Sequence, residues 1–222
     1  MRLRPSSGES AEMYLKSLLL LGGDQVHVPI STLAIRLGVS PISATERVHR
    51  LRAEAQLDHQ PYQGVRLTRQ GRAAALRVIR RHRLWECFLH DQLGLAWDRV
   101  HTIACQLEHA VGDEVAEALA VHLGEPSACP HGNPIPSGTR DWRRAEGVRL
   151  DELAPGQRGV LLCVEPETPE ILAQLAQVGM RPGVRLRRED RASSGQLRLQ
   201  VAGRSARLTA ETAQHVHVAV ED

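Results

Sequence analysis

The chain has 222 residues, of which 42% are hydrophobic, enough for one large domain or for two or three small ones with buried cores. The net charge is only +2, but residues 1–83 carry 14 basic and 6 acidic side chains, which favours an anionic partner such as nucleic acid. The chain has no apolar run of about 18 residues, no secretory signal and no paired cysteine spacing, so we expect a cytoplasmic protein without a membrane span or a disulfide framework.

Residues 1–72 predict a winged helix-turn-helix domain. A helix over about residues 10–21 and a short strand at 26–28 come first. Helices over residues 32–37 and 41–54 follow, and the glycine-containing turn between them is typical of a helix-turn-helix. Two short strands within residues 57–67 form the predicted wing. We expect Ile42, Val48 and Leu51 to face the core, while the polar residues of helix 41–54 face DNA.

A helical region and a small β domain are predicted after the wing. Residues 70–90, 98–110 and 113–123 have helical patterns, and four prolines between residues 124 and 138 disfavour regular structure there. From residue 148 onward, strand-like runs at 160–164, 184–186, 197–201 and 216–220 surround one helix at 169–178, which indicates a small β-barrel. The predicted fold class is therefore mainly α with a small β domain. The predicted divisions are a DNA-binding domain (1–72), a helical domain (73–138), a linker (139–147) and a barrel (148–222).

Side chains that bind transition metals line the two central helices. One pair stands four residues apart and so lies on one face of its helix: His82 and Glu86. Four more side chains stand at i, i+4, i+7 and i+8, within about a third of the helix circumference: His101, Cys105, Glu108 and His109. Imidazole, thiol and carboxylate groups on one stripe suit a transition-metal ion. The alternative for His82 and Glu86 is an ordinary surface pair.

Several segments carry a family resemblance. They are E-M-Y-L at 12–15, V-S-P-I-S-A-T-E at 39–46, L-T-R-Q-G at 67–71, R-R-H-R-L-W-E at 80–86, V-H-T-I-A-C-Q-L-E-H at 100–109 and H-G-N-P-I-P at 131–136. Over nearly its whole length the chain resembles the diphtheria-toxin-repressor family of metal-dependent transcriptional regulators. The resemblance implies a winged helix, a helical dimerisation and metal-binding domain, and a C-terminal SH3-like barrel.

The resemblance also implies two metal sites in each subunit. The regulatory site would consist of Met13, Cys105, Glu108 and His109. The ancillary site would consist of His82, Glu86 and His101, with Glu167 and Glu170 from the barrel domain. The implied effector is Fe²⁺ or Mn²⁺, and Zn²⁺, Co²⁺, Ni²⁺ or Cd²⁺ could bind in vitro. The chain lacks the acids that manganese-specific members without a barrel usually have at Met13, Lys16 and Cys105, so it resembles the iron-type subgroup, although Mn²⁺ stays open.

In this family a metal-loaded homodimer binds palindromic double-stranded operator DNA and represses metal-uptake genes. A metal that fixes the angle between the N-terminal domain and the dimerisation domain would set the spacing of the two recognition helices. The candidate DNA contacts here are Ser40, Pro41, Ser43, Thr45, Arg47, Arg50 and Arg66. Neither a membrane nor a small-molecule substrate is an expected partner.

Two other classes of function could use the same side chains or bind the same metals. A metal-dependent hydrolase could use the same side chains, but the sequence has no H-E-x-x-H, no G-x-S-x-G and no phosphate-binding glycine loop, so an enzyme is not expected. A metal buffer without a DNA role would not explain the basic N-terminal third. Cys129 and His131, two residues apart in the proline-rich loop, could bind metal or could simply be structural.

Overall fold

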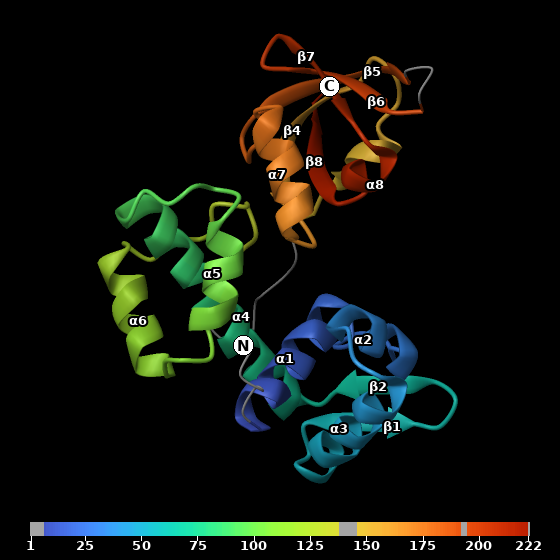
Figure 1. The fold of residues 1–222 in the computed structure, drawn as a ribbon, viewed down its shortest axis with the longest axis vertical. Coiled ribbons are helices and arrows are strands. Elements are labelled where there is room, and N and C mark those ends of the chain that lie inside the picture. Colours follow the sequence, from blue (N-terminus) through green and yellow to red (C-terminus); the bar gives the residue numbers. More distant parts are fainter. Residues whose placement is uncertain (1–6, 138–145, 192–194, 222) are drawn as a thin grey trace. The chain divides into compact units, whose positions relative to one another are not determined.

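The computed structural model describes residues 7–137, 146–191 and 195–221. The chain divides into two compact units, one made of residues 1–81 with 136–141 and the other of residues 82–135 with 142–222 (Figure 1). Most of the predicted linker, residues 139–147, lies outside the described residues. Within the described part of the chain, no helix is both long and apolar enough to cross a membrane.

The first unit is a winged helix-turn-helix. Its elements are α1 (Ser7–Leu20), α2 (Ile30–Leu37), α3 (Pro41–Ala53), β1 (Leu57–Gln60), β2 (Gly64–Leu67) and the first part of α4 (Arg69–Cys87). The turn between α2 and α3 contains Gly38 with φ +64°, a backbone conformation that suits glycine. Ser40 caps α3 by accepting a hydrogen bond from the Ser43 amide at 3.1 Å, and Pro41 stands at the first helical position. The predicted helix-turn-helix and wing are confirmed.

Two local predictions in this unit are wrong. Ile42 was expected in the core but is 74% exposed. The buried face of α3 consists of Ala44, Val48 and Leu51, and at about 100° per residue Ile42 points roughly opposite Ala44. The expected strand at residues 26–28 is reduced to an isolated bridge between Val28 and Val65. Gly64 lies so close to this bridge that a Cβ atom would overlap the Val28 carbonyl.

The second unit begins with the last part of α4. A π-helical turn, η1 (Phe88–Gln92), continues the helix where an α-helix to residue 90 was expected. Then come α5 (Val100–Leu107) and α6 (Asp113–His122). Both are slightly shorter than the helices that the sequence predicts. The described part of the proline-rich segment, residues 124–137, contains neither helix nor strand, as expected.

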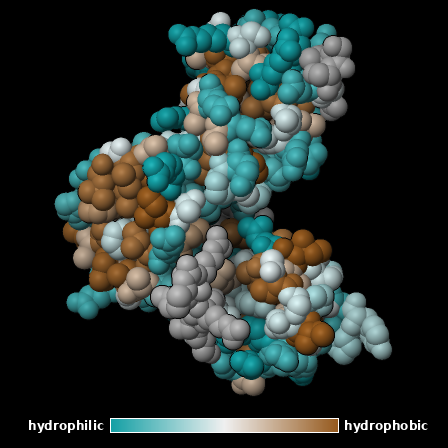
Figure 2. All heavy atoms as spheres, in the orientation of Figure 1, coloured by the Kyte–Doolittle hydropathy of each residue, from teal (hydrophilic) through white to brown (hydrophobic). Residues whose placement is uncertain are grey.

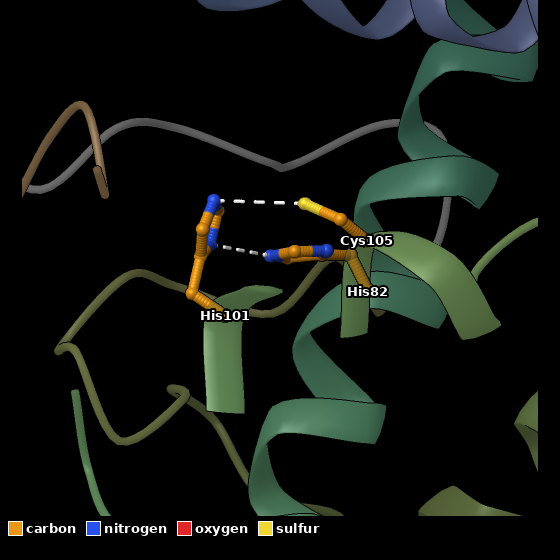
Figure 3. A group of neighbouring side chains, drawn as sticks. All are labelled: His82, His101 and Cys105. Carbon is orange, nitrogen blue, oxygen red and sulfur yellow. Dashed lines mark hydrogen bonds between the residues drawn. The ribbon is translucent and has the colours of Figure 1, made fainter. Parts of the chain in front are cut away.

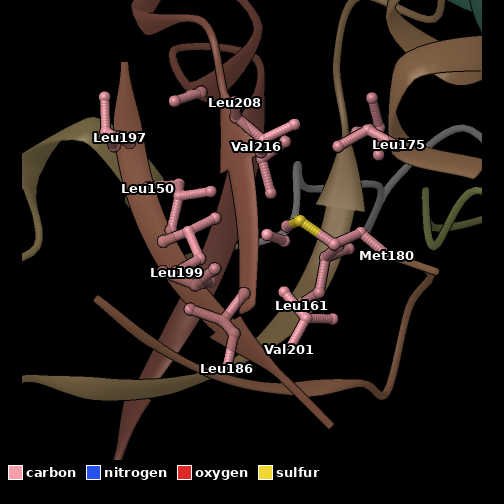
Figure 4. Packing of buried hydrophobic residues seen from close by; sticks show 14 of the residues in the cluster. Leu150, Leu161, Leu175, Met180, Leu186, Leu197, Leu199, Val201, Leu208 and Val216 are labelled. Carbon is pink, nitrogen blue, oxygen red and sulfur yellow. The ribbon is translucent and has the colours of Figure 1, made fainter. Parts of the chain in front are cut away.

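The C-terminal part of this unit is an antiparallel sheet with strand order β3-β8-β4-β5-β6-β7. The strands are β3 (Val148–Arg149), β4 (Arg158–Val164), β5 (Arg185–Arg191), β6 (Leu197–Val201), β7 (Arg204–Leu208) and β8 (Val216–Glu221). Three helical segments accompany them: η2 (Leu150–Glu152), α7 (Pro169–Gln177) and α8 (Ala210–Ala213). Leucine, valine and methionine side chains fill the core between the sheet and the helices (Figure 4). The fold class is therefore the predicted one.

Trp97 ties the helical part of the second unit to the sheet. It precedes α5, yet its side chain is buried in the same cluster as Leu161, Leu172 and Met180. The guanidinium of Arg181 lies 5.6 Å from the centre of the Trp97 ring. Trp97 of the helical part thus belongs to the hydrophobic core of the sheet, while the other buried apolar residues of the helical part form clusters of their own.

Candidate metal centre

Glu86 is the centre of a buried polar cluster. Its side chain is completely buried on α4. Its Oε1 atom lies 2.9 Å from His82 Nε2, 3.2 Å from His101 Nδ1 and 3.2 Å from His131 Nδ1. Among the described residues its other oxygen, Oε2, is buried and has no hydrogen-bond partner. A buried carboxylate oxygen without a partner is costly, and a cation at this position would remove that cost.

His82 and His101 lie on different helices and meet beside Glu86. Their facing nitrogens, His82 Nε2 and His101 Nδ1, are 3.1 Å apart, and the other His101 nitrogen lies 3.6 Å from Cys105 Sγ (Figure 3). His82 and Glu86 on α4 therefore meet the predicted ligands His101 and Cys105 on α5. The surface-pair alternative for His82 and Glu86 does not apply, because both side chains are buried.

Glu167 reaches the same cluster from the segment between β4 and α7. Its Oε2 lies 3.1 Å from His101 Nδ1 and 3.7 Å from His82 Nε2, and its Oε1 lies 3.8 Å from His131 Nδ1. Asn133 donates hydrogen bonds from Nδ2 both to Glu167 Oε1 and to the Val164 carbonyl, the latter at 2.9 Å. The side chain that the family resemblance named from the barrel domain is thus held in place by the proline-rich loop.

The proline-rich loop itself contributes two further side chains to the cluster, Cys129 and His131. Val164 donates a backbone hydrogen bond to the His131 carbonyl at 3.1 Å, which fixes the loop against β4. His131 Nε2 lies 2.9 Å from the carbonyl of Trp97. A carbonyl only accepts, so Nε2 carries a proton and Nδ1 is the nitrogen turned toward Glu86. This is the arrangement of a metal-binding histidine whose outer nitrogen is fixed by a backbone carbonyl.

Opposite charges hold the cluster together. Burial raises the pKa of Glu86, but the neighbouring His82 and His131 outweigh it and hold the pKa well below its ordinary value. Burial also lowers the pKa of His101, but its hydrogen bonds with Cys105, Glu167 and Glu86 raise that pKa to about 11. Burial and the nearby Glu86 raise the pKa of the Cys129 thiol. Without a metal the cluster therefore contains protonated imidazole beside carboxylate.

Glu108 connects this cluster to the remaining part of the predicted regulatory site. It is buried, with Oε2 2.5 Å from His82 Nδ1 and Oε1 3.1 Å from His109 Nε2. Cys105 is half-buried one turn earlier in the same helical segment. These three predicted ligands, Cys105, Glu108 and His109, therefore lie next to the cluster around Glu86.

Two predicted ligands lie neither in the cluster around Glu86 nor beside Glu108. Met13 belongs to α1 in the first unit and is 38% exposed. Glu170 is exposed in the first turn of α7, three residues beyond Glu167. The ligand roles of Met13 and Glu170 stay predictions.

The donor sets fit a divalent metal. Among the described residues, three groups place one ligand atom from each member within 4.8 Å of the others. The groups are His82, His101 and Cys105; His82, Glu86, His101 and Glu167; and Glu86, Cys129, His131 and Glu167. Imidazole and carboxylate suit Mn²⁺ and Fe²⁺, and a thiolate adds affinity for softer ions such as Zn²⁺.

The predicted DNA contacts lie on the first unit. Ser40, Pro41, Ser43 and Arg50 are exposed at α3 or its start, and Arg66 is exposed on the wing strand β2. Arg47 and Thr45 on α3 are half-buried, and Thr45 Oγ1 donates to the Pro41 carbonyl at 2.8 Å. The DNA-contact roles of these residues stay predictions.

Family models match the chain in three consecutive segments. "Iron dependent repressor, N-terminal DNA binding domain" matches residues 7–65, and "Iron dependent repressor, metal binding and dimerisation domain" matches residues 68–137. "FeoA domain" matches residues 148–220. The diphtheria toxin repressor of Corynebacterium jeikeium is 32% identical over an alignment 198 residues long, and the match covers 79% of this chain and 82% of that relative. The chain belongs to the diphtheria-toxin-repressor family.

Other members of this family resemble the chain to a similar extent. The iron-dependent repressor IdeR of Mycobacterium tuberculosis is 32% identical over an alignment 203 residues long, and the match covers 84% of this chain and 86% of IdeR. A solved manganese-dependent transcriptional repressor in complex with manganese is 33% identical, with a TM-score of 0.86, and the match covers 95% of this chain and all of that one. ScaR with bound Zn²⁺ is 30% identical, with a TM-score of 0.81, and the match covers 97% of this chain and 99% of ScaR.

The chain is thus a member of a family of metal-dependent transcriptional repressors. These comparisons support the prediction of a regulator, and they do not support the hydrolase or metal-buffer alternatives.

Proposed function

We propose that this chain represses transcription by binding operator DNA as a homodimer when a divalent cation fills the cluster around Glu86. The observation that carries the proposal is the buried carboxylate oxygen of Glu86, which lacks a partner among the described residues while imidazole and carboxylate groups surround it. A cation there would replace the protons that now lie between these side chains, so metal binding would release protons.

The proposed ligands divide into two sets that could hold two ions per subunit. The first set is taken from the cluster: His82, Glu86, His101 and Glu167, with Cys129 and His131 grouped with the same two carboxylates. The second set consists of Cys105, Glu108 and His109, to which the family resemblance adds Met13. Fe²⁺ and Mn²⁺ are the proposed effectors, since the relative IdeR is named an iron-dependent repressor and a similar solved structure a manganese-dependent one.

DNA binding is assigned to the first unit. The family model for the DNA-binding domain matches it, and the exposed start of α3 follows a helix-turn-helix geometry. Its net positive charge favours a polyanion. Double-stranded operator DNA is therefore the proposed partner.

Homodimer formation is assigned to the helical part of the second unit, which matches the dimerisation model. Figure 2 shows hydrophobic residues gathered on the visible face of this helical part. Leu93, Val115 and Val121 are large apolar side chains that remain exposed there. Apolar surface of this kind marks a protein–protein contact.

The decisive experiment measures DNA binding by the metal-free, anaerobic protein before and after addition of Fe²⁺, Mn²⁺ or Zn²⁺. The probe is promoter DNA from metal-uptake genes of the source organism, and an unrelated duplex of equal length is the control. Tight binding to the promoter only with metal supports the proposal and ranks the effectors. Equal binding with a chelator and with each metal would refute it.

A further inference from the structure

Arginines gather on the outer face of the C-terminal sheet. Arg158 on β4 stands directly opposite Arg187 on β5, and Arg198 on β6 stands directly opposite Arg207 on β7. Arg185 lies two residues before Arg187, so it points to the same face. All five side chains are exposed. These five arginines form the arginine face of the sheet.

The arginine face has more positive charge than its acidic neighbours balance. Glu221 lies 3.0 Å from Arg185, and Glu189 lies 3.5 Å from Arg198. Among the residues that the structure describes, Arg187 donates only to the Gly156 carbonyl, at 3.2 Å. Within the described part of the chain, Arg158 and Arg207 have no hydrogen-bond or carboxylate partner.

Two arginines directly opposite each other destabilise a pair of strands. Arg158 also stands opposite Glu221 on β8, but Glu221 lies 3.0 Å from Arg185, so one carboxylate faces three guanidinium groups and the repulsion between Arg158 and Arg187 remains. A bound anion would turn this repulsion into attraction. The placement of the two guanidinium groups therefore points to an anionic ligand.

A shallow hollow of about 370 Å³ lies over this part of the sheet. Its lining includes Arg158, Arg185 and Arg187 together with Gln200 and Glu221. Guanidinium groups bind phosphate through two parallel hydrogen bonds. The lining contains no aromatic side chain, so the hollow offers nothing on which a base could stack. Phosphate is the group that this chemistry recognises.

The length of the arginine face favours a polymer over a single phosphate. The arginines extend over four adjacent strands, from β4 to β7. At about 4.8 Å between neighbouring strands, the row covers roughly 14 Å. A compact anion would occupy only one end of such a row, whereas successive phosphates of a nucleic-acid strand can occupy all of it.

We propose that the arginine face binds the phosphate backbone of double-stranded DNA. This inference rests on the proposed function, because it assumes that the same chain is brought to DNA by its helix-turn-helix. Contacts to phosphate carry no sequence information, so the arginine face would strengthen binding to every duplex by a similar factor.

The test compares Arg158→Gln, Arg187→Gln and the double variant with wild type, each as the full chain loaded with metal. Affinity for the promoter duplex and for an unrelated duplex is measured over a series of salt concentrations. Loss of one phosphate contact lowers the slope of log K against log salt by about 0.9. We expect a drop of that size for each single variant and of about twice that size for the double variant, on both duplexes.

Arg149→Gln is the matched control. Arg149 also lies on the barrel, but its Nε is 3.1 Å from Asp151 and 3.0 Å from Glu152, so its charge is already neutralised. We expect its salt slope to equal that of wild type. Melting temperatures no lower than that of wild type in all variants would show that the sheet remains folded.

Equal salt slopes in wild type, the Arg149 variant and the Arg158 variant would overturn the inference. Failure of the wild-type chain to bind either duplex at low salt would also overturn it. So would binding of inorganic pyrophosphate to the arginine face while the salt slopes of DNA binding stay equal in all variants. Equal binding of both duplexes with and without metal would refute the proposed function instead. In that case the comparison of slopes would still decide whether the arginine face contacts DNA.

Discussion

Replacement of Glu86 by Gln tests the centre of the metal cluster most directly. The amide keeps the volume of the side chain but removes its charge, and Glu86 belongs to two of the three groups of ligand atoms. Loss of a side chain that only supports a ligand already costs 10–100-fold in metal affinity, so we expect a loss of about 100-fold or more for Glu86→Gln.

This loss can be read as a change in melting temperature. Metal at about 100 times its dissociation constant stabilises the native chain by about 2.7 kcal/mol. Each kcal/mol raises the melting temperature of a chain of this size by roughly 2–4 °C, so wild type should gain roughly 5–11 °C. After a 100-fold loss of affinity the same metal concentration contributes only about 0.4 kcal/mol, or roughly 1 °C.

The metal-free variant should also be less stable than metal-free wild type. Glu86 faces His82, His101 and His131 in a fully buried site. Removal of one partner from a buried ion pair costs about 3–5 kcal/mol, because the remaining charge stays buried without compensation. Relaxation through loss of an imidazole proton limits the cost, so we expect a value near the lower end, about 3 kcal/mol.

Thermal unfolding followed by circular dichroism, with a chelator and with Mn²⁺ or Co²⁺, measures both effects. Glu211→Gln is the control, because Glu211 is exposed in the first turn of α8 and lies outside all three groups. A Glu86→Gln variant that keeps the full metal-dependent rise in melting temperature would contradict the assignment of Glu86 as a ligand.

Three further predictions follow from the same site and its support. Protonated His101, with its pKa of about 11, and protonated His131 must lose protons to bind metal, so metal affinity should rise with pH and binding should release protons. Calorimetric titration in buffers of different ionisation enthalpy measures the protons released. Metal affinity that is independent of pH would contradict this prediction. Cys129→Ser should weaken binding of Zn²⁺ more than that of Mn²⁺ in competition with a fluorescent chelator, because a thiolate is the softer ligand; equal losses would remove Cys129 from the ligand set. Leu172→Ala, within the core shared by Trp97 and the sheet, should cost about 2–5 kcal/mol in urea unfolding, and a cost below about 1 kcal/mol would show that this packing is not tight.

Much of the cluster was accessible from the sequence. The spacing of His82 and Glu86 and the stripe that begins at His101 define helical faces whatever the tertiary structure, because the helix period fixes which side chains align. Glu167 was accessible only through the family resemblance. Nothing in its own segment distinguishes it from Glu165 or Glu170.

The positions of His131 and Cys129 could not be predicted from sequence periodicity. The loop that carries them has no period of helix or strand, so the sequence left open whether they bind metal. Their positions depend on distant contacts, namely the Trp97 carbonyl and the Val164 amide, and such contacts leave no local signal. A similar reason explains why β7 was missed. Only Ala206 and Leu208 of that strand are buried, and three of its five residues are exposed polar side chains.

Trp97 couples local unfolding of the C-terminal sheet to the metal cluster. Its indole belongs to the core of the barrel, while its carbonyl fixes the histidine of the proline-rich loop. Local opening of the barrel would therefore withdraw packing from Trp97 and remove Glu167 from the cluster at the same time. In hydrogen-exchange terms, the amides of α5, the loop and β4 should exchange as one cooperative unit, and bound metal should slow all of them together. The barrel of this chain is then part of the sensor's folding unit and not an independent appendage.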